Sequence, residues 1–145
     1  MGRFLRLAFL TAPLVALLAL PLAAAAGVVV VVNPKSGVER LSRDDVINIF
    51  MGRYRKLPNG QVAIPVDLPA AESVKAEFYH LLVGKDMDQI AAYWSRLVFT
   101  GRTAPPRQAE SVENLIAYIA ANPGAVGYLD SSDVDRRMKV VLELK

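Results

Sequence analysis

Five consecutive valines, at positions 28–32, constrain this chain more than any other feature of its sequence. β-branched side chains favour an extended strand, and an uninterrupted apolar run leaves no face of that strand suited to water. The run therefore predicts a strand buried on both faces, the pattern of a central parallel strand covered by helices. The turn-forming residues 33–37, NPKSG, end it.

Residues 1–26 are predicted to be a signal peptide that is cleaved on export. Two arginines, Arg3 and Arg6, lie near its start, a short apolar stretch follows, and four alanines at its end supply a cleavage point. An uncleaved membrane anchor is the alternative. Pro13, Pro21 and the shortness of the apolar stretch argue against it.

The chain contains no cysteine, which excludes disulfides and thiolate metal sites. It also excludes the lipid anchor of bacterial lipoproteins, which needs a cysteine directly after the cleavage point. Lys and Arg number 17 against 14 Asp and Glu, and Arg3 and Arg6 belong to the signal segment. The remaining single domain, residues 27–145, is nearly neutral and gives no electrostatic case for nucleic-acid binding. We expect a soluble periplasmic protein without a membrane span after cleavage.

Helical and strand patterns alternate after the valine run. Ser42 and Asp45 form a capping box for a first helix, Pro69 suits the first position of a second, Asp86 caps a third, and a fourth begins near Ser111. Further strands are predicted at residues 62–66, 125–129 and 138–144. Strands separated by helices predict an α/β fold with a mostly parallel sheet flanked by helices and right-handed crossovers.

Several segments, in order, resemble the phosphate-type substrate-binding proteins of ABC transporters. The segment LSRDDVINIFMGR at 41–53 is similar to a helix of that family, and YWSRLVFTG at 93–101 and NPGAVGYL at 122–129 bracket its last helix. The resemblance covers residues 28–130 and implies a single periplasmic-binding-protein-like (type 2) lobe, similar to the second lobe of these proteins. The family holds its ligand in a cleft between two lobes, and residues 27–145 suffice for one.

The resemblance also implies an anion site between the strand at 62–66 and the following helix. There the family carries an arginine and a Ser-Gly-Thr-type turn at a helix N-terminus. This chain has VDLPAAES at 66–73, which lacks both and places Asp67 and Glu72 in the loop, with Ser73 as the remaining hydroxyl. A phosphate would meet negative charge, so we expect weak binding at most. Stabilisation of the helix N-terminus is the ordinary alternative role for the two acids.

Three other residues are candidate anion ligands. Ser36 follows the first strand, and the carboxyl ends of strands line the ligand crevice of open α/β sheets. Thr100 and Arg102 share one loop, and a guanidinium can bind phosphate or carboxylate bidentately. A plain turn around Ser36 and a solvated Arg102 are the simpler alternatives. His80, the single histidine, is expected to be structural or at the surface, and Trp94 is expected in the core.

No sequence motif predicts catalysis, a cofactor or a metal ion. The chain has neither G-x-S-x-G nor a phosphate-binding glycine-rich loop with lysine, so we expect a protein that is not an enzyme. One hypothesis is a secreted solute-binding-like domain that binds a small anion such as phosphate weakly, with a homodimer supplying the second wall of the site. The alternative is a ligand-free interaction module that has lost phosphate binding and docks on another envelope protein.

Cleavage near Ala26 would leave a protein that begins directly before the valine strand. We expect intact-mass spectrometry of the periplasmic product to give the mass of a chain starting at or near Gly27, because the small residues up to that point suit the signal peptidase. Retention of residues 1–20 in the exported product would contradict the prediction.

Overall fold

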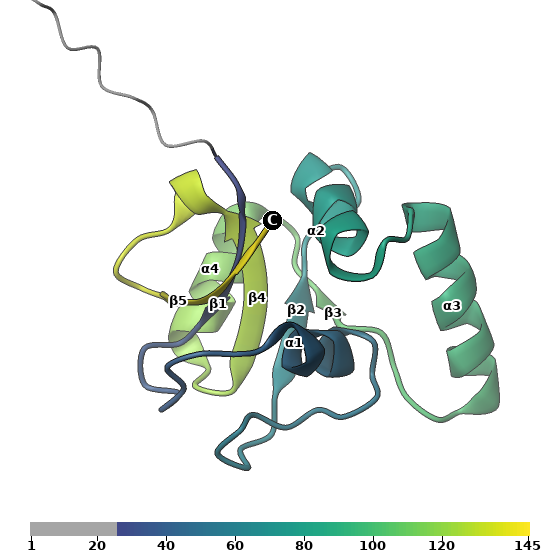
Figure 1. Cartoon of the computed structure of the whole chain (residues 1–145), viewed down its shortest axis with the longest axis horizontal. Helices are drawn as coiled ribbons and strands as arrows, with labels where there is room; N and C mark the ends of the chain where they lie inside the picture. Colours follow the sequence, from purple (N-terminus) through teal and green to yellow (C-terminus); the bar gives the residue numbers. More distant parts are fainter. Residues whose placement is uncertain (1–25) are drawn as a thin grey trace, which may run out of the picture.

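The computed structural model of the chain describes residues 26–145 (Figure 1). The predicted signal peptide, residues 1–26, lies outside this range except for Ala26. Among the described residues, no helix combines the length and the apolar character that a membrane crossing requires.

A five-stranded sheet in the order β3-β2-β4-β1-β5 forms the centre of the described part of the chain. Its strands are β1 (Val28–Val32), β2 (Ile64–Asp67), β3 (Arg107–Gln108), β4 (Ala125–Asp130) and β5 (Lys139–Leu144). β2 pairs in parallel with β3 and β4, whereas β1 pairs antiparallel with β4 and with β5. All strands but β1 therefore run in one direction.

The valine strand β1 is interior and fully buried, as predicted from its side chains. The prediction that it is a parallel strand is wrong, because both of its neighbours run the opposite way. Burial on both faces follows from the helices that cover a sheet, and the side-chain pattern carries no information about strand direction. The predicted α/β fold, with a mostly parallel sheet flanked by helices, is confirmed.

The helices are α1 (Arg43–Phe50), α2 (Ser73–Val83), α3 (Met87–Thr100) and α4 (Val112–Ala121). Capping boxes at Ser42 and Asp86 begin α1 and α3, and the Ser111 hydroxyl caps α4. The start predicted for α2 is wrong. Pro69 lies in a turn, closed by the Glu72 N–H donating to the Pro69 carbonyl at 3.0 Å, and the helix begins after that turn.

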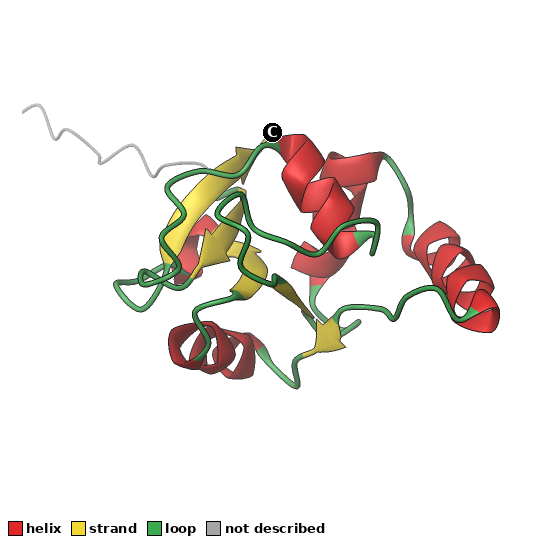
Figure 2. Ribbon diagram, turned by 90° about the horizontal axis from the view of Figure 1, so that it is seen from below, coloured by secondary structure: helices red, strands yellow, loops and turns green. Residues whose placement is uncertain are grey.

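Helices cover both faces of the sheet (Figure 2), and two adjacent residues of β4 show how. Gly127 faces α4, where a Cβ atom would lie 3.0 Å from the Leu115 side chain. Tyr128 faces the other way, stacks on Phe78 of α2 with ring centroids 3.8 Å apart, and meets Phe50 of α1 edge-on at 5.7 Å. The core is thus continuous from α4 through the sheet to α1 and α2.

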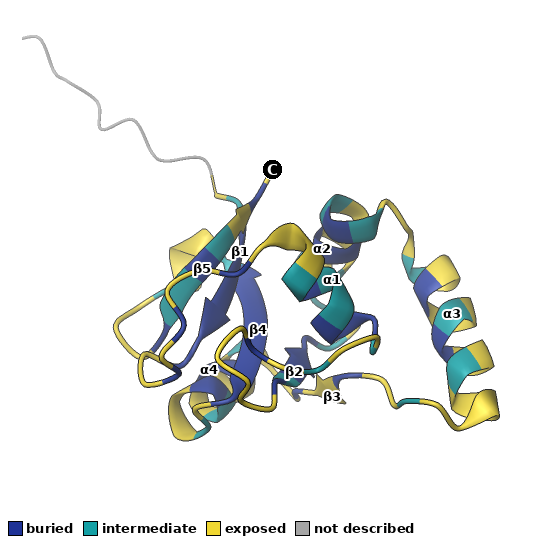
Figure 3. Ribbon diagram, turned by 60° about the horizontal axis from the view of Figure 1, so that its bottom comes forward, coloured by how far each residue is buried: buried dark blue, intermediate teal, exposed yellow. Residues whose placement is uncertain are grey.

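Helix α3 lies apart from the sheet, at the side of the molecule beyond α2 (Figure 1). Ile90 and Trp94 face inward and are buried, which confirms the core position predicted for Trp94. The Tyr93 hydroxyl donates to the Met51 carbonyl at 2.7 Å and fixes α3 to the end of α1. The side of α3 that points away from the molecule is exposed (Figure 3).

The outer strand β5 is irregular. Its pairing with β1 shifts register between Val30 and Val31, and the shift leaves Val141 without a partner on β1. The Val141 carbonyl instead accepts the backbone N–H of Leu41 at 3.1 Å. The loop before α1 therefore binds to β5.

Two glycines with positive φ provide a matched test of how α3 is held. A Cβ on Gly52 (φ +71°) would lie 2.8 Å from Thr103 and 2.9 Å from the Trp94 ring, whereas nothing lies within 4 Å of one on Gly84 (φ +67°). We expect Gly84→Ala to cost about 1 kcal/mol from backbone strain, and Gly52→Ala about 2 kcal/mol more because of the clash. Urea unfolding of both variants measures the difference, and equal losses would show that α3 is not held against Gly52.

Candidate functional site

A buried polar cluster lies at the carboxyl end of β2. Asp67 is only 7% exposed. The Tyr79 hydroxyl of α2 donates to Asp67 Oδ2 at 2.9 Å, the Tyr128 hydroxyl of β4 donates to Oδ1, and the Lys75 ammonium lies 3.5 Å from Oδ2. We call these four residues the Asp67 cluster.

Local structure explains how the cluster forms. Lys75 and Tyr79 are four residues apart on α2 and therefore share one helix face. Tyr128 is on β4, the parallel neighbour of β2. The Leu68 N–H donates to the Tyr128 hydroxyl oxygen at 3.1 Å, which leaves the hydroxyl proton of Tyr128 for the Asp67 carboxylate.

The hydrogen-bonding pattern is that of an ionised carboxylate, because both oxygens of Asp67 accept a tyrosine proton. Burial raises the pKa of Asp67, while the tyrosine hydrogen bonds and Lys75 oppose that rise. Burial and the adjacent carboxylate raise the pKa of Tyr79 and of Tyr128. Both phenols are therefore kept as proton donors to the carboxylate.

Neither role expected for the acids of the 66–73 loop describes Asp67. It is not an exposed charge that meets solvent, and it does not stabilise the start of α2, whose first turn contains no acidic residue. Glu72 occupies the N-cap position but makes no side-chain hydrogen bond to the helix. Tyr79 and Tyr128 were not among the predicted site residues. The sequence does show that Lys75 and Tyr79 are four residues apart and so share one helix face. That spacing does not reveal that the end of β2, with Asp67, lies against this face.

The direction of β1 places Ser36 far from this cluster along the sheet. Because β1 is antiparallel to β4, the turn after β1 lies at the edge where β4 begins, whereas Asp67 lies at the edge where β2 ends. Ser36 is 3% exposed, and its hydroxyl accepts the Val38 N–H at 3.1 Å. Its carbonyl accepts from Asn59 at 2.8 Å. Ser36 therefore does not line a crevice at the carboxyl ends of β2 and β4.

The other three predicted ligands are also separated. Thr100 ends α3, where its hydroxyl donates to the Leu97 carbonyl at 2.8 Å, and Arg102 is exposed in the turn that follows. Ser73 is the exposed first residue of α2. Of these three residues, it is the one near the carboxyl end of β2. Within residues 26–145, no hydrogen bond joins any two of Ser36, Ser73, Thr100 and Arg102.

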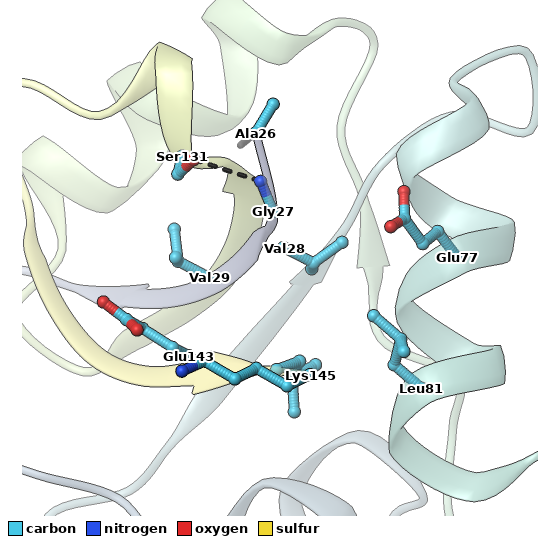
Figure 4. Close-up of a pocket in the computed structure, with 10 residues that line it drawn as sticks. Ala26, Gly27, Val28, Val29, Glu77, Leu81, Ser131, Glu143 and Lys145 are labelled. Atoms are coloured by element: carbon cyan, nitrogen blue, oxygen red, sulfur yellow. Dashed lines mark hydrogen bonds between the residues drawn. The ribbon is translucent and has the colours of Figure 1, made fainter. Parts of the chain in front are cut away.

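A hollow of about 560 Å³ opens at the carboxyl edge of the sheet, between the β1–β5 pair and α2 (Figure 4). Its lining includes the apolar Val29 and Leu81 and, among charged side chains, Glu77, Glu143 and Lys145. Two carboxylates against one ammonium make it a poor site for a phosphate. Among the described residues, no group of three or more His, Asp or Glu side chains is arranged to hold a metal ion.

No protein-family model matches the chain, and no curated protein matches its sequence. Solved structures match its fold. An ABC-type phosphate transport receptor from Vibrio cholerae has a TM-score of 0.63 and 19% identity, covering 80% of this chain and 45% of that one. A candidate phosphate ABC transporter substrate-binding protein from Clostridium perfringens, solved with bound phosphate, has a TM-score of 0.63 and 16% identity, covering 80% and 44%. A possible phosphate binding protein from Planctomyces limnophilus has a TM-score of 0.59 and 16% identity, covering 80% and 40%.

The chain therefore has the α/β fold found in phosphate ABC transporter substrate-binding proteins, and the resemblance predicted from the sequence is confirmed for the fold. It spans less than half the length of these proteins, which fits the extent of a single lobe. These three proteins are described as a transport receptor and binding proteins, not as enzymes.

The raised pKa of Asp67 predicts how stability changes with pH. The folded state holds the proton of Asp67 more tightly than the unfolded state, so the contribution of Asp67 to stability falls as the pH rises from about 4 through the folded-state pKa. Asn does not titrate. Urea midpoints of the parent and of Asp67→Asn should therefore shift in favour of the variant as the pH rises from about 3 to about 7. A difference that moves in favour of the parent would show that the pKa is lowered instead.

Proposed function

We propose that the chain is an exported, single-lobe domain with the solute-binding fold that no longer binds phosphate at the β2–α2 loop and acts by contact with another protein chain. The observation that supports the proposal is the Asp67 cluster. The hydrogen-bond donors at the carboxyl end of β2, where the resemblance implies an anion site, already bind the Asp67 carboxylate. Export rests on the predicted signal peptide at residues 1–26.

The available donors make the first part of the argument. A phosphate at the carboxyl end of β2 would need hydrogen-bond donors and positive charge. Lys75, Tyr79 and Tyr128 supply both, but all three are directed at the Asp67 carboxylate. Because this carboxylate is covalently part of the chain, it competes with any free anion at a high effective concentration.

Charge makes the second part of the argument. A phosphate beside the cluster would also stand close to the carboxylate of Asp67. Two unit charges about 6 Å apart repel by roughly 3 kcal/mol at an effective dielectric near 20, which corresponds to about a hundredfold loss of affinity. Glu77 in the neighbouring hollow adds to the negative potential at the same edge.

Weak binding of a small anion such as phosphate remains the second candidate function, and one observation favours it. The N-cap residue Glu72 makes no side-chain capping hydrogen bond to α2, so the first backbone N–H groups of this helix have no side-chain cap, and the exposed Ser73 lies beside them. A site there would be open to solvent on one side, and it would bury only part of the anion.

A thermal-shift titration tests the loss of phosphate binding. We expect the parent to keep its unfolding midpoint in 1 mM phosphate relative to chloride at equal ionic strength, because a dissociation constant weaker than roughly millimolar gives little stabilisation at that concentration. A rise of several degrees would contradict the proposal and favour the site at Ser73, which Ser73→Ala would then weaken.

Asp67→Ala provides the informative comparison for this titration. The substitution removes the carboxylate and leaves three donors facing a vacancy of formate size. Formate should therefore raise the midpoint of Asp67→Ala but not that of the parent, nor that of Asp67→Asn, whose amide fills the space. Equal responses of all three proteins would show that the cluster is not an anion site occupied by Asp67.

A further inference from the structure

The outward side of α3 is an apolar surface that no element within residues 26–145 covers. Phe99 is 94% exposed and Val98 is 53% exposed, and they border a shallow hollow of about 480 Å³ beside Ala91 and Ser95. We define the outer face of α3 by its residues Asp88, Ala91, Ala92, Ser95, Val98 and Phe99, all of them exposed. Neighbouring exposed apolar side chains on one helix face form a patch that is typical of an interaction surface.

The residues of this face are ordered by size and charge. Asp88 is in the first turn, small side chains occupy the middle around Ser95, and the large Phe99 is in the last turn. Arg102 follows the helix end and is exposed. Neither Asp88 nor Arg102 forms an ion pair within residues 26–145. One end of the face is therefore acidic and small, and the other is basic and bulky.

We propose that the outer face of α3 binds the same face of a second copy of this chain, with the two helices antiparallel about a two-fold axis at Ser95. This inference rests on the proposed function and names the partner. Positions 91 and 99 are equidistant from Ser95 in the sequence, as are positions 88 and 102. The two-fold axis therefore places Phe99 of one copy over Ala91 of the other. Arg102 lies just beyond the end of α3 at Gly101, so its long side chain extends toward Asp88 of the other copy.

The same two-fold axis thus pairs each large side chain with a small one and each acidic end of the face with a basic end. The small Ser95 at the axis lets the helices approach to about 8 Å, and each bulky Phe99 meets a small Ala91. A different protein would have to supply, independently, small side chains opposite Phe99 and charges opposite in sign to Asp88 and Arg102. A single pair of helices about 21 Å long buries less than a standard interface, so we expect a weak dimer with a dissociation constant on the order of tens of micromolar.

Analytical ultracentrifugation from about 10 to 500 μM tests the dimer, since this range brackets the expected constant. The parent should change from monomer to dimer across the range, and Phe99→Asp should weaken association at least about tenfold because it buries a charge at the contact. Val62→Asp is the matched control, because Val62 is 64% exposed on a different surface and should leave association unchanged. A parent that stays monomeric, or a Phe99→Asp protein whose dissociation constant equals that of the parent, would overturn the proposal.

A charge exchange tests the antiparallel arrangement itself. Asp88→Arg alone and Arg102→Asp alone should each weaken association, because each places like charges opposite one another across the axis. The double variant should restore it. Association that stays weak in the double variant would show that these two residues do not face each other.

The absence of cysteine makes a third test specific. Ser95→Cys should form a disulfide-linked dimer on mild oxidation, because the two Cβ atoms at the axis come within about 4 Å, whereas Ala117→Cys on the exposed side of α4 should not. Equal cross-linking of both variants would overturn the arrangement. The phosphate titration is independent of these experiments, so a failure of the dimer and a failure of the proposed loss of phosphate binding give different results.

Discussion

The backbone pairing of β1 on both of its sides organises this domain. β1 holds β4 on one side and β5 on the other, and each pairing requires those strands to run against it. The reversed direction sends the chain back across the sheet, so that the turn after β1 and the end of β2 come to opposite edges. Which polar residues can meet in one site is therefore decided by a buried strand of valines that contributes no polar side chain itself.

The Asp67 cluster couples three elements through one carboxylate. β2 supplies the acid, α2 supplies Lys75 and Tyr79, and β4 supplies Tyr128, whose ring also stacks on Phe78. A buried charge with every partner in place restricts its neighbours to one arrangement, and it becomes costly when a partner is removed. The carboxyl end of β2, where the sequence resemblance implies an anion site, is thus part of a buried, fully partnered cluster here.

Local chemistry explains which features the sequence predicts well. Ser42 and Asp86 cap their own helices within three residues, so a few adjacent residues determine where α1 and α3 begin. The start of α2 was misplaced because Pro69 suits a turn as well as a first helical turn. The direction of β1 and the contact of Asp67 with Tyr128 depend on residues more than fifty positions away. No periodicity in the sequence carries that information.

The irregular edge at β5 limits how copies of this chain can assemble. A regular outer strand offers a row of free backbone groups to which further strands can add without limit. Here the register shift near Val141 and the hydrogen bond from Leu41 occupy part of that row, and the opposite edge is the two-residue strand β3. Growth into fibres by edge-to-edge pairing is therefore disfavoured, and contacts between side chains on helices can close into assemblies of finite size.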